Sequence, residues 1–339
     1  MDLQQDLISV VIPAYNQPQY LRSALQSIVD QEYRPIEIIV SDDCSPTPLG
    51  AVADEFSRFQ SDSFTVRYFR ASANRGVIDN FRFAVGQARG AYLVPMPHDN
   101  RFVDRRFFTE AVRTMGGRAD CHLCYGNAFY ENSERKALNI PGHISFDDGW
   151  AVLEGRDFIR LYRRGGLDWS QAIVLDNGMA HSLGAYDVPY VVNGAIARRL
   201  GISQDDMFSY VFLLSAMGSV GLCRKPVCEI GTPPESYSRS AAWINTKARV
   251  KFFIFYNLWR SSIKGAYAAD VRQMALRQAL QYADRILDRR MGAYYGWHPS
   301  FLLMCAFGLA KSAWSTVRYA VKRGVNLIRP NTFKKTRRP

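Results

Sequence analysis

The sequence has few cysteines, and their spacing does not suggest a metal site or a disulfide framework. Six cysteines are spread over 339 residues, far below the density of small secreted domains that depend on disulfides. Cys121 and Cys124 form a single Cys-x-x-Cys pair in an alternating apolar stretch, with no second pair at zinc-like spacing. We therefore expect reduced thiols, and we interpret the pair as part of a strand.

The sequence also shows neither a signal-peptide pattern in its first residues nor a long apolar run. Residues 1–6 are polar and acidic, without the basic-then-apolar order of a signal peptide. Near the other end, the apolar run Phe301–Ala310 is followed by Lys311 and is much shorter than the roughly 20 residues that cross a bilayer. We expect neither export nor a transmembrane helix, and hence a cytoplasmic protein.

Acidic residues are absent from 301–339, where nine lysines and arginines lie. Most of the formal net charge of +12 therefore belongs to one tail, and this distribution argues against a nucleic-acid-binding protein. Two interpretations of the tail stay open. It is either an interfacial helix at an anionic membrane surface, which we favour and would place at the inner face of the plasma membrane, or a docked helix with a solvated basic end.

Buried strands alternate with amphipathic helices in the first part of the chain. The runs Ile8–Ile12 and Ile36–Val40, which are apolar except at Ser9 and Glu37, are typical of strands buried on both faces of a parallel sheet. Between them, apolar residues of 19–31 recur at three- and four-residue spacing, which predicts a helix. The pattern continues with helices over 49–59 and 78–88 and strands over 64–69 and 91–94. It predicts an α/β fold with an open, mainly parallel twisted sheet and helices on both faces.

Beyond residue 100 the pattern is weaker. It predicts a strand over 121–130, helices over 155–163 and 205–217, and a short strand over 218–223. Residues beyond 237 are expected to be mainly helical.

Polar residues follow the predicted strands, where ligands bind in open parallel sheets. These positions hold Ala14–Asn16, the pair Asp42 and Asp43, and His98–Asn100. The two carboxylates can accept hydrogen bonds from a base or from ribose hydroxyls, or they cap a turn or the next helix. The first strand lacks the Gly-x-Gly-x-x-Gly turn of dinucleotide-binding oxidoreductases, which makes that class a poor fit.

Five ordered blocks resemble the inverting family 2 of GT-A-fold glycosyltransferases. The blocks are Ile8–Asn16, Leu25–Gln31, Ile36–Ser45, Asn74–Phe81 and Gly90–Tyr92. The resemblance is close over residues 1–100 and loose up to Val227. It implies a nucleotide-sugar-binding half (1–100), an acceptor-binding half of the same GT-A domain (101–235), and a helical C-terminal extension with the basic tail (236–339).

The resemblance implies a donor site built from these strand ends. At least one of Asp42 and Asp43 is expected to hold the nucleoside, while 14–16 offer backbone groups and a ring face to the base. Arg239 either clamps phosphate or is an ordinary surface arginine. The expected nucleotide-sugar ligands are Pro13, Ala14, Tyr15, Asn16, Asp42, Asp43, Asn74, Gly76, Asn80, His98 and Arg239.

The metal motif departs from the family pattern, which has Asp-x-Asp after the fourth strand. Asp99 matches the second Asp, while Pro97 stands at the first position and Asn100 where a further acid often follows. We expect Asp99 to hold a divalent ion, Mg²⁺ or Mn²⁺, because Mg²⁺ rarely needs an all-protein cage. His98 either compensates for the missing acid or is a packed histidine.

An acidic pair in the second half matches the position of the family's catalytic base. Asp206 aligns with the base and Asp205 with its acidic neighbour. A positioned carboxylate can take the proton of the attacking hydroxyl. The same acids also suit the start of a helix, and the two roles are compatible.

Together, the resemblance implies a hexosyl- or deoxyhexosyltransferase. It would move a sugar with inversion from a UDP- or dTDP-sugar to a hydroxyl of a glycan or lipid-linked glycan in bacterial surface polysaccharide synthesis. Residues 74–81 carry the expectation for the donor, by analogy alone. The alternative, motivated by Pro97 and Asn100, is a non-catalytic sugar-nucleotide-binding protein.

Overall fold

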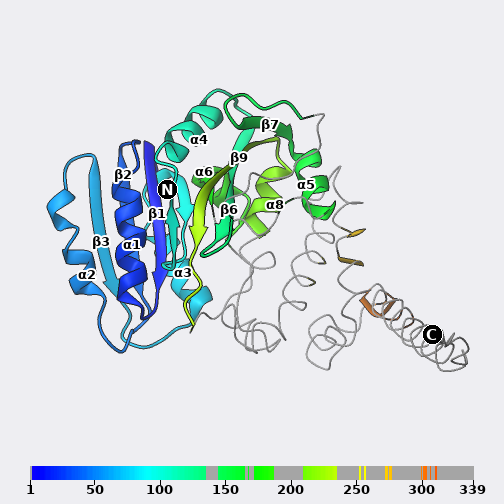
Figure 1. The fold of residues 1–339 in the computed structure, drawn as a ribbon. Coiled ribbons are helices and arrows are strands. Elements are labelled where there is room, and N and C mark those ends of the chain that lie inside the picture. Colours follow the sequence, from blue (N-terminus) through cyan, green and yellow to red (C-terminus); the bar gives the residue numbers. More distant parts are fainter. Residues whose placement is uncertain are drawn as a thin grey trace, which may run out of the picture.

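One mixed β-sheet runs through the described part of the chain. The computed structural model describes residues 2–134, 144–164, 167, 172–186 and 209–234, with isolated helical positions between 252 and 310. The sheet follows the order β3-β2-β1-β4-β8-β6-β9-β5, and β7 pairs with β9. Figure 1 shows β3, β2 and β1 side by side at one end of this sheet. The strands are β1 (Gln4–Ala14), β2 (Ile36–Asp42), β3 (Phe64–Arg70), β4 (Gly90–Pro95), β5 (Asn100–Phe102), β6 (Cys121–Tyr130), β7 (Trp150–Glu154), β8 (Ile173–Asp176) and β9 (Ser219–Ile230).

Helices connect these strands on both sides of the sheet. They are α1 (Pro18–Val29), α2 (Gly50–Asp54), α3 (Val77–Gly86), α4 (Phe107–Gly116), α5 (Gly155–Arg164), α6 (Asn177–Ser182) and α8 (Ser209–Ser215), with a 3₁₀ turn η1 (Ser57–Phe59). The α/β fold with helices on both faces is confirmed. The predicted helix over 49–59 is divided into α2 and η1.

The strands β1 to β4 run parallel to one another, as the sequence predicts. The register places Ala14 opposite Asp42, and Asp42 opposite Arg70. The carboxyl ends of the first three strands therefore form one edge of the sheet, and their last side chains are neighbours.

Two buried clusters explain why the central residues of β1 and β2 are apolar apart from Ser9 and Glu37. Ile8, Val10 and Ile12 pack on one face with residues of α1 and α4, whereas Val11 packs on the other face with residues of α3 and α5. The remaining buried polar pair, Ser9 and Glu37, is hydrogen-bonded at 2.6 Å. Both faces of these strands are covered, so the alternation typical of a half-exposed strand is absent.

The second half of the sheet mixes directions. β8 is antiparallel to both β4 and β6, while β6 and β9 are parallel. The predicted strand over 218–223 continues to Ile230 as β9, past Pro226, where the register with β6 shifts. Cys121 and Cys124 lie buried in β6 with free thiols, which confirms that the pair is part of a strand.

The sheet passes from residues 1–100 into 101–235 without a break, while the domain boundaries themselves stay a prediction. Within the described residues, every helix is too short or too polar to span a membrane.

Candidate functional site

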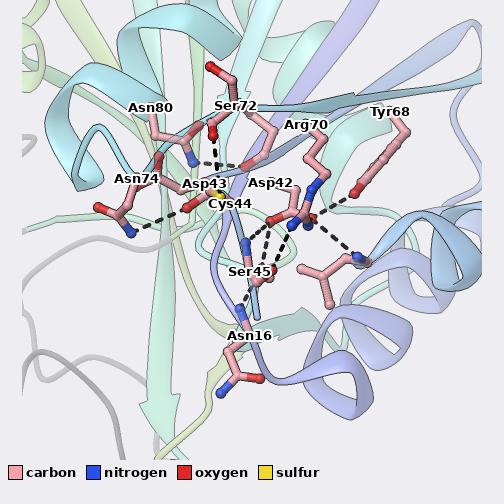
Figure 2. A network of polar contacts seen from close by, with 12 residues as sticks. Asn16, Asp42, Asp43, Cys44, Ser45, Tyr68, Arg70, Ser72, Asn74 and Asn80 are labelled. Carbon is pink, nitrogen blue, oxygen red and sulfur yellow. Dashed lines mark hydrogen bonds and ion pairs between the residues drawn. The ribbon is translucent and has the colours of Figure 1, made fainter. Parts of the chain in front are cut away.

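The site begins with Asp42, the last residue of β2, which is fully buried. Its Oδ1 accepts hydrogen bonds from the Ser45 amide at 2.8 Å and the Ser45 hydroxyl at 2.6 Å. Its Oδ2 accepts from the Leu49 amide at 3.2 Å, the Tyr68 hydroxyl at 2.6 Å and Arg70 Nη1 at 2.9 Å. Figure 2 shows Tyr68 and Arg70 converging on this carboxylate, with Ser45 on its other side.

These contacts keep Asp42 ionised. Burial alone raises the pKa of the Asp42 carboxyl, but the hydrogen bonds from Ser45, Tyr68 and the Leu49 amide outweigh it and hold the pKa below its ordinary value of 3.8. The carboxylate is thus a fixed negative charge that organises the loop after β2.

The loop after β1 is held by the loop after β2. The Asn16 amide donates to the Ser45 hydroxyl at 2.8 Å, as Figure 2 shows. Asn16 and Gln17 are both left-handed, with φ of 59° and 60°, and Cys44 has φ of 61°. Side chains other than glycine seldom adopt this conformation. Beside these residues, Tyr15 keeps 46% of its surface exposed.

Asp43 joins the loop after β2 to the loop before α3. Its Oδ1 accepts from the Arg75 amide at 2.8 Å and its Oδ2 from the Gly76 amide at 2.9 Å. Asn74 Nδ2 donates to the Asp43 carbonyl at 3.2 Å, and the Asp43 amide donates to the Ala14 carbonyl at 2.9 Å. Gly76 has φ of +86°, a conformation that favours glycine.

Asn80 has a packing role in this structure. It is buried in α3, its Oδ1 accepts from the Ser41 hydroxyl at 2.6 Å, and its Nδ2 donates to the Ser41 carbonyl at 2.8 Å. These bonds attach the start of α3 to the end of β2, and so fix the loop of residues 74–76.

The turn after β4 carries His98 and Asp99. The Pro13 carbonyl accepts a hydrogen bond from the His98 ring, while burial lowers the pKa of that ring against the opposing effects of Asp99 and Pro13. Burial raises the pKa of Asp99, whose backbone carbonyl accepts from the Gly231 amide at 2.9 Å. His98 Nε2 is buried and has no hydrogen-bond partner among the described residues.

A second carboxylate, Glu131, stands near this turn. Glu131 Oε2 accepts from the Thr232 amide at 3.0 Å, the Thr232 hydroxyl at 3.2 Å and the Tyr20 hydroxyl at 3.3 Å. Its charge contributes to the raised pKa values of Asp99 and of Tyr20, although burial is the largest cause in both. These contacts tie β6, β9 and α1 together beside Asp99.

The donor set of this turn fits a divalent ion only in part. Asp99 supplies one carboxylate, and the described residues contain no cluster of three histidine, cysteine or acidic side chains suited to a metal ion. A single carboxylate fits the mode in which Mg²⁺ takes its remaining ligands from substrate phosphates and water.

The structure gathers most of the expected donor ligands at one edge of the sheet. The strand ends of β1 and β2, the loops that follow β1, β2, β3 and β4, and the start of α3 hold these residues, which are Pro13 to Asn16, Asp42, Asp43, Asn74, Gly76, Asn80, His98 and Asp99. Asp205, Asp206 and Arg239 lie outside the described residues, so their roles stay predictions.

The sequence interpretation missed Ser45, Tyr68, Arg70 and Glu131. Ser45 stood inside a block already recognised, so its position after the two acids was an available signal. Tyr68 and Arg70 had none, because they act through the register of β3 against β2.

Comparisons with known proteins show similarity to glycosyltransferases. The sequence model of Glycosyl transferase family 2 matches residues 9–164. The GalNAc(5)-diNAcBac-PP-undecaprenol beta-1,3-glucosyltransferase of Campylobacter jejuni is 28% identical over 169 residues, which cover 48% of this chain and 53% of that protein. The chain spans about half the length of the curated relatives it matches.

Solved structures share the fold. TarS 1–349 of S. aureus, crystallised with UDP, has a TM-score of 0.61 at 13% identity and covers 94% of this chain and 91% of that one. The mannosyltransferase PcManGT of Pyrobaculum calidifontis, solved with GDP-Man and Mn²⁺, has a TM-score of 0.51 at 15% identity over 91% of this chain and 86% of that one. At these identities the likeness shows a common GT-A fold.

Proposed function

We propose that this chain, whose residues 9–164 match the model of Glycosyl transferase family 2, is an inverting glycosyltransferase that uses a nucleoside-diphosphate sugar. One observation carries the proposal. The loops after β1, β2 and β4 are joined by the contact of Asp43 with Ala14 and the contact of His98 with Pro13. Such an edge is where parallel α/β sheets bind nucleotides.

The nucleoside end of the donor is assigned to the loops after β1 and β2. Asp43 accepts one backbone hydrogen bond on each oxygen, which leaves acceptor capacity for a base N–H or a ribose hydroxyl. The half-exposed ring of Tyr15 offers a face to the base. UDP and dTDP are the nucleotides proposed, in line with the UDP bound by TarS.

The diphosphate end is assigned to the turn after β4. Asp99 would hold a divalent ion, Mg²⁺ or Mn²⁺, which stabilises negative charge on the departing diphosphate. Arg239 is proposed to contact the same phosphates.

The transfer itself is assigned to Asp206, with Asp205 as its neighbour. Asp206 takes the proton of the acceptor hydroxyl while the hydroxyl oxygen bonds to the anomeric carbon. The bond from that carbon to the diphosphate oxygen breaks in the same step, so the configuration inverts and the nucleoside diphosphate leaves.

The acceptor is proposed to be a glycan or lipid-linked glycan of the bacterial cell envelope. The name of the Campylobacter relative, an enzyme acting on an undecaprenol-linked glycan, supports this class. The acid-free basic segment 301–339 is proposed to bring the enzyme to the inner face of the plasma membrane.

One alternative function, a non-catalytic sugar-nucleotide-binding protein, is supported by a specific observation. Pro97 replaces an acid of the metal motif, and Asp99 is then the only carboxylate on that turn. The two functions differ in turnover. Incubation with UDP- and dTDP-sugars and a lipid-linked glycan extract should release nucleoside diphosphate, and Asp206→Ala should lose about 10²–10⁴-fold of this activity while still binding UDP or dTDP. An Asp206→Ala protein with undiminished turnover would refute the assignment of the base.

A further inference from the structure

We propose that Asp42 and Ser45 form a positioning relay, in which the Ser45 hydroxyl sets the conformation of the Tyr15–Asn16 loop for the nucleotide. The inference rests on the proposed function, since it assigns to this loop a part in donor binding. In this relay Asp42 positions the loop after β1, whereas Asp43 is the acid proposed to contact the nucleoside.

The Asp42 carboxylate has no acceptor capacity left. Its two oxygens accept five hydrogen bonds, whereas an ionised carboxylate offers about four lone-pair sites. Its side chain has 0% exposure. A base or ribose group could reach Asp42 only by displacing groups that already neutralise it, so its contribution to donor binding is indirect.

Ser45 connects Asp42 to the loop after β1. Its hydroxyl donates its single hydrogen to Asp42 Oδ1 at 2.6 Å, and its oxygen then accepts from the Asn16 amide at 2.8 Å. A hydroxyl has one hydrogen and two lone pairs, so the bond to Asp42 orients a lone pair toward Asn16. Figure 2 shows Ser45 between the two residues.

The recipient of this bond needs external support. Asn16 and Gln17 are consecutive left-handed residues, and each such residue costs about 1 kcal/mol or more unless its surroundings hold it there. The Ser45 bond holds the first of them. Tyr15, the exposed ring beside them, takes its position from the same backbone.

Arg70 fixes the opposite end of the relay. Its Nη1 binds Asp42 Oδ2 at 2.9 Å and its Nη2 binds the Ser45 carbonyl at 2.8 Å. One guanidinium therefore spans both residues, and the register of β3 against β2 puts Arg70 directly beside Asp42. The relay runs from β3 through β2 to the loop after β1, across three neighbouring strands.

The hydroxyls of Ser45 and Tyr68 both bind the Asp42 carboxylate, so variants of these two residues form a matched comparison. Ser45 and Tyr68 both donate to Asp42 at 2.6 Å, but Ser45 alone of the two also accepts from Asn16. Ser45→Ala should raise the Kd for UDP and dTDP, measured by calorimetry with and without MgCl₂, about tenfold. It should also speed hydrogen–deuterium exchange in the peptide that covers residues 13–20. Tyr68→Phe should leave that exchange unchanged and the Kd within about twofold.

The measured outcomes distinguish a positioning relay from a general loss of stability in the variants. Equal Kd and exchange in Ser45→Ala and wild type, or equal losses in both variants, would overturn the relay. A wild-type protein that binds neither nucleotide would refute the proposed donor, and the exchange comparison would still decide the relay. Should Ser45→Ala not fold, Ser45→Cys replaces it with the same two readouts, because a thiol keeps the shape and weakens both hydrogen bonds. The donor KM in the active enzyme should rise with little change in kcat.

Discussion

The two ends of the candidate donor site are built differently. At the nucleoside end, Asp42 accepts five hydrogen bonds and Asp43 binds two backbone amides from another loop. At the diphosphate end, on the turn after β4, the Asp99 backbone carbonyl accepts from the Gly231 amide, and His98 Nε2 has no partner among the described residues. The first end is preorganised by the protein itself, whereas the second is proposed to use donor phosphates and an ion for its chemistry.

The largest difference between the ends should appear in turnover. Asp99→Asn removes the carboxylate assigned to the ion and should lower kcat/KM about 10²–10³-fold. The Kd for UDP or dTDP in the absence of metal should stay within about threefold, since the nucleoside end is intact. Steady-state kinetics with Mn²⁺ titration, together with metal-free calorimetry, measures both. A variant with normal metal-dependent turnover would show that the ion is bound elsewhere.

Substitutions at the nucleoside end should instead have their main effect on the free energy of unfolding. Asp42→Asn places an amide among donors that now face a carboxylate, which should cost about 3 kcal/mol of unfolding free energy. Urea unfolding followed by circular dichroism gives the value. Glu55→Gln, which removes an exposed partner of Arg22, is the control and should hardly move the midpoint. A similarly small effect for Asp42→Asn would mean that the network is not rigid.

The same carboxylate predicts a pH dependence of the unfolding free energy. The folded-state pKa of Asp42 lies below its ordinary value of 3.8, so the unfolded chain takes up the proton first as the pH falls. The stabilisation is complete above 3.8 and is lost as the pH drops through the depressed folded value. Urea midpoints measured across this range should fall more steeply for the wild type than for Asp42→Asn. Equal slopes would contradict the assignment.

Gly231 should be important at the diphosphate end, because it lies against the turn after β4. A Cβ added at Gly231 would stand 2.0 Å from the Asp99 carbonyl oxygen and 2.9 Å from Tyr20 Cε1. Gly231→Ala should therefore shift the turn and reduce turnover about tenfold, equivalent to about 1.4 kcal/mol, with a smaller change in nucleotide Kd. Gly86→Ala is the control, because its Cβ would meet nothing within 4 Å. Equal turnover in Gly231→Ala and Gly86→Ala would show that the conformation of this turn does not affect catalysis.

The smallest effect tests backbone strain at the nucleoside end. Cys44 has φ of 61° between Asp43 and Ser45, and glycine adopts this conformation without a Cβ penalty. Cys44→Gly should raise the unfolding free energy by at most about 1 kcal/mol, measured by urea unfolding. A clear loss of stability would mean that the Cys44 side chain contributes more than its weak contact with the Ser72 carbonyl at 3.8 Å.

The first half of the fold was predictable because its signals are local. The apolar run of β1 and the stripe of α1 need only neighbouring residues to be recognised. The structure adds elements that the sequence interpretation did not contain, among them β5, with three residues, and β8, with four. Elements this short lack a recognisable period, and their pairing across the sheet defines them.

The location of the site was predictable from the sequence, whereas the separate roles of its residues were less so. Asp42 and Asp43 are adjacent acids after one strand, and nothing local distinguishes them. The distinction comes from Tyr68 and Arg70, which lie 26 and 28 residues further along the chain. Only the register of β3 brings these two side chains to Asp42.

The most direct test of the account is calorimetric titration of the wild type and Asp43→Asn with UDP and dTDP. The wild type should bind at least one of them. Asp43→Asn should bind it about tenfold or more weakly, because a charge-assisted acceptor for the nucleoside is lost. A wild type that binds neither nucleotide, or an Asp43→Asn protein that binds as tightly as the wild type, would contradict the assignment of this edge of the sheet to the donor.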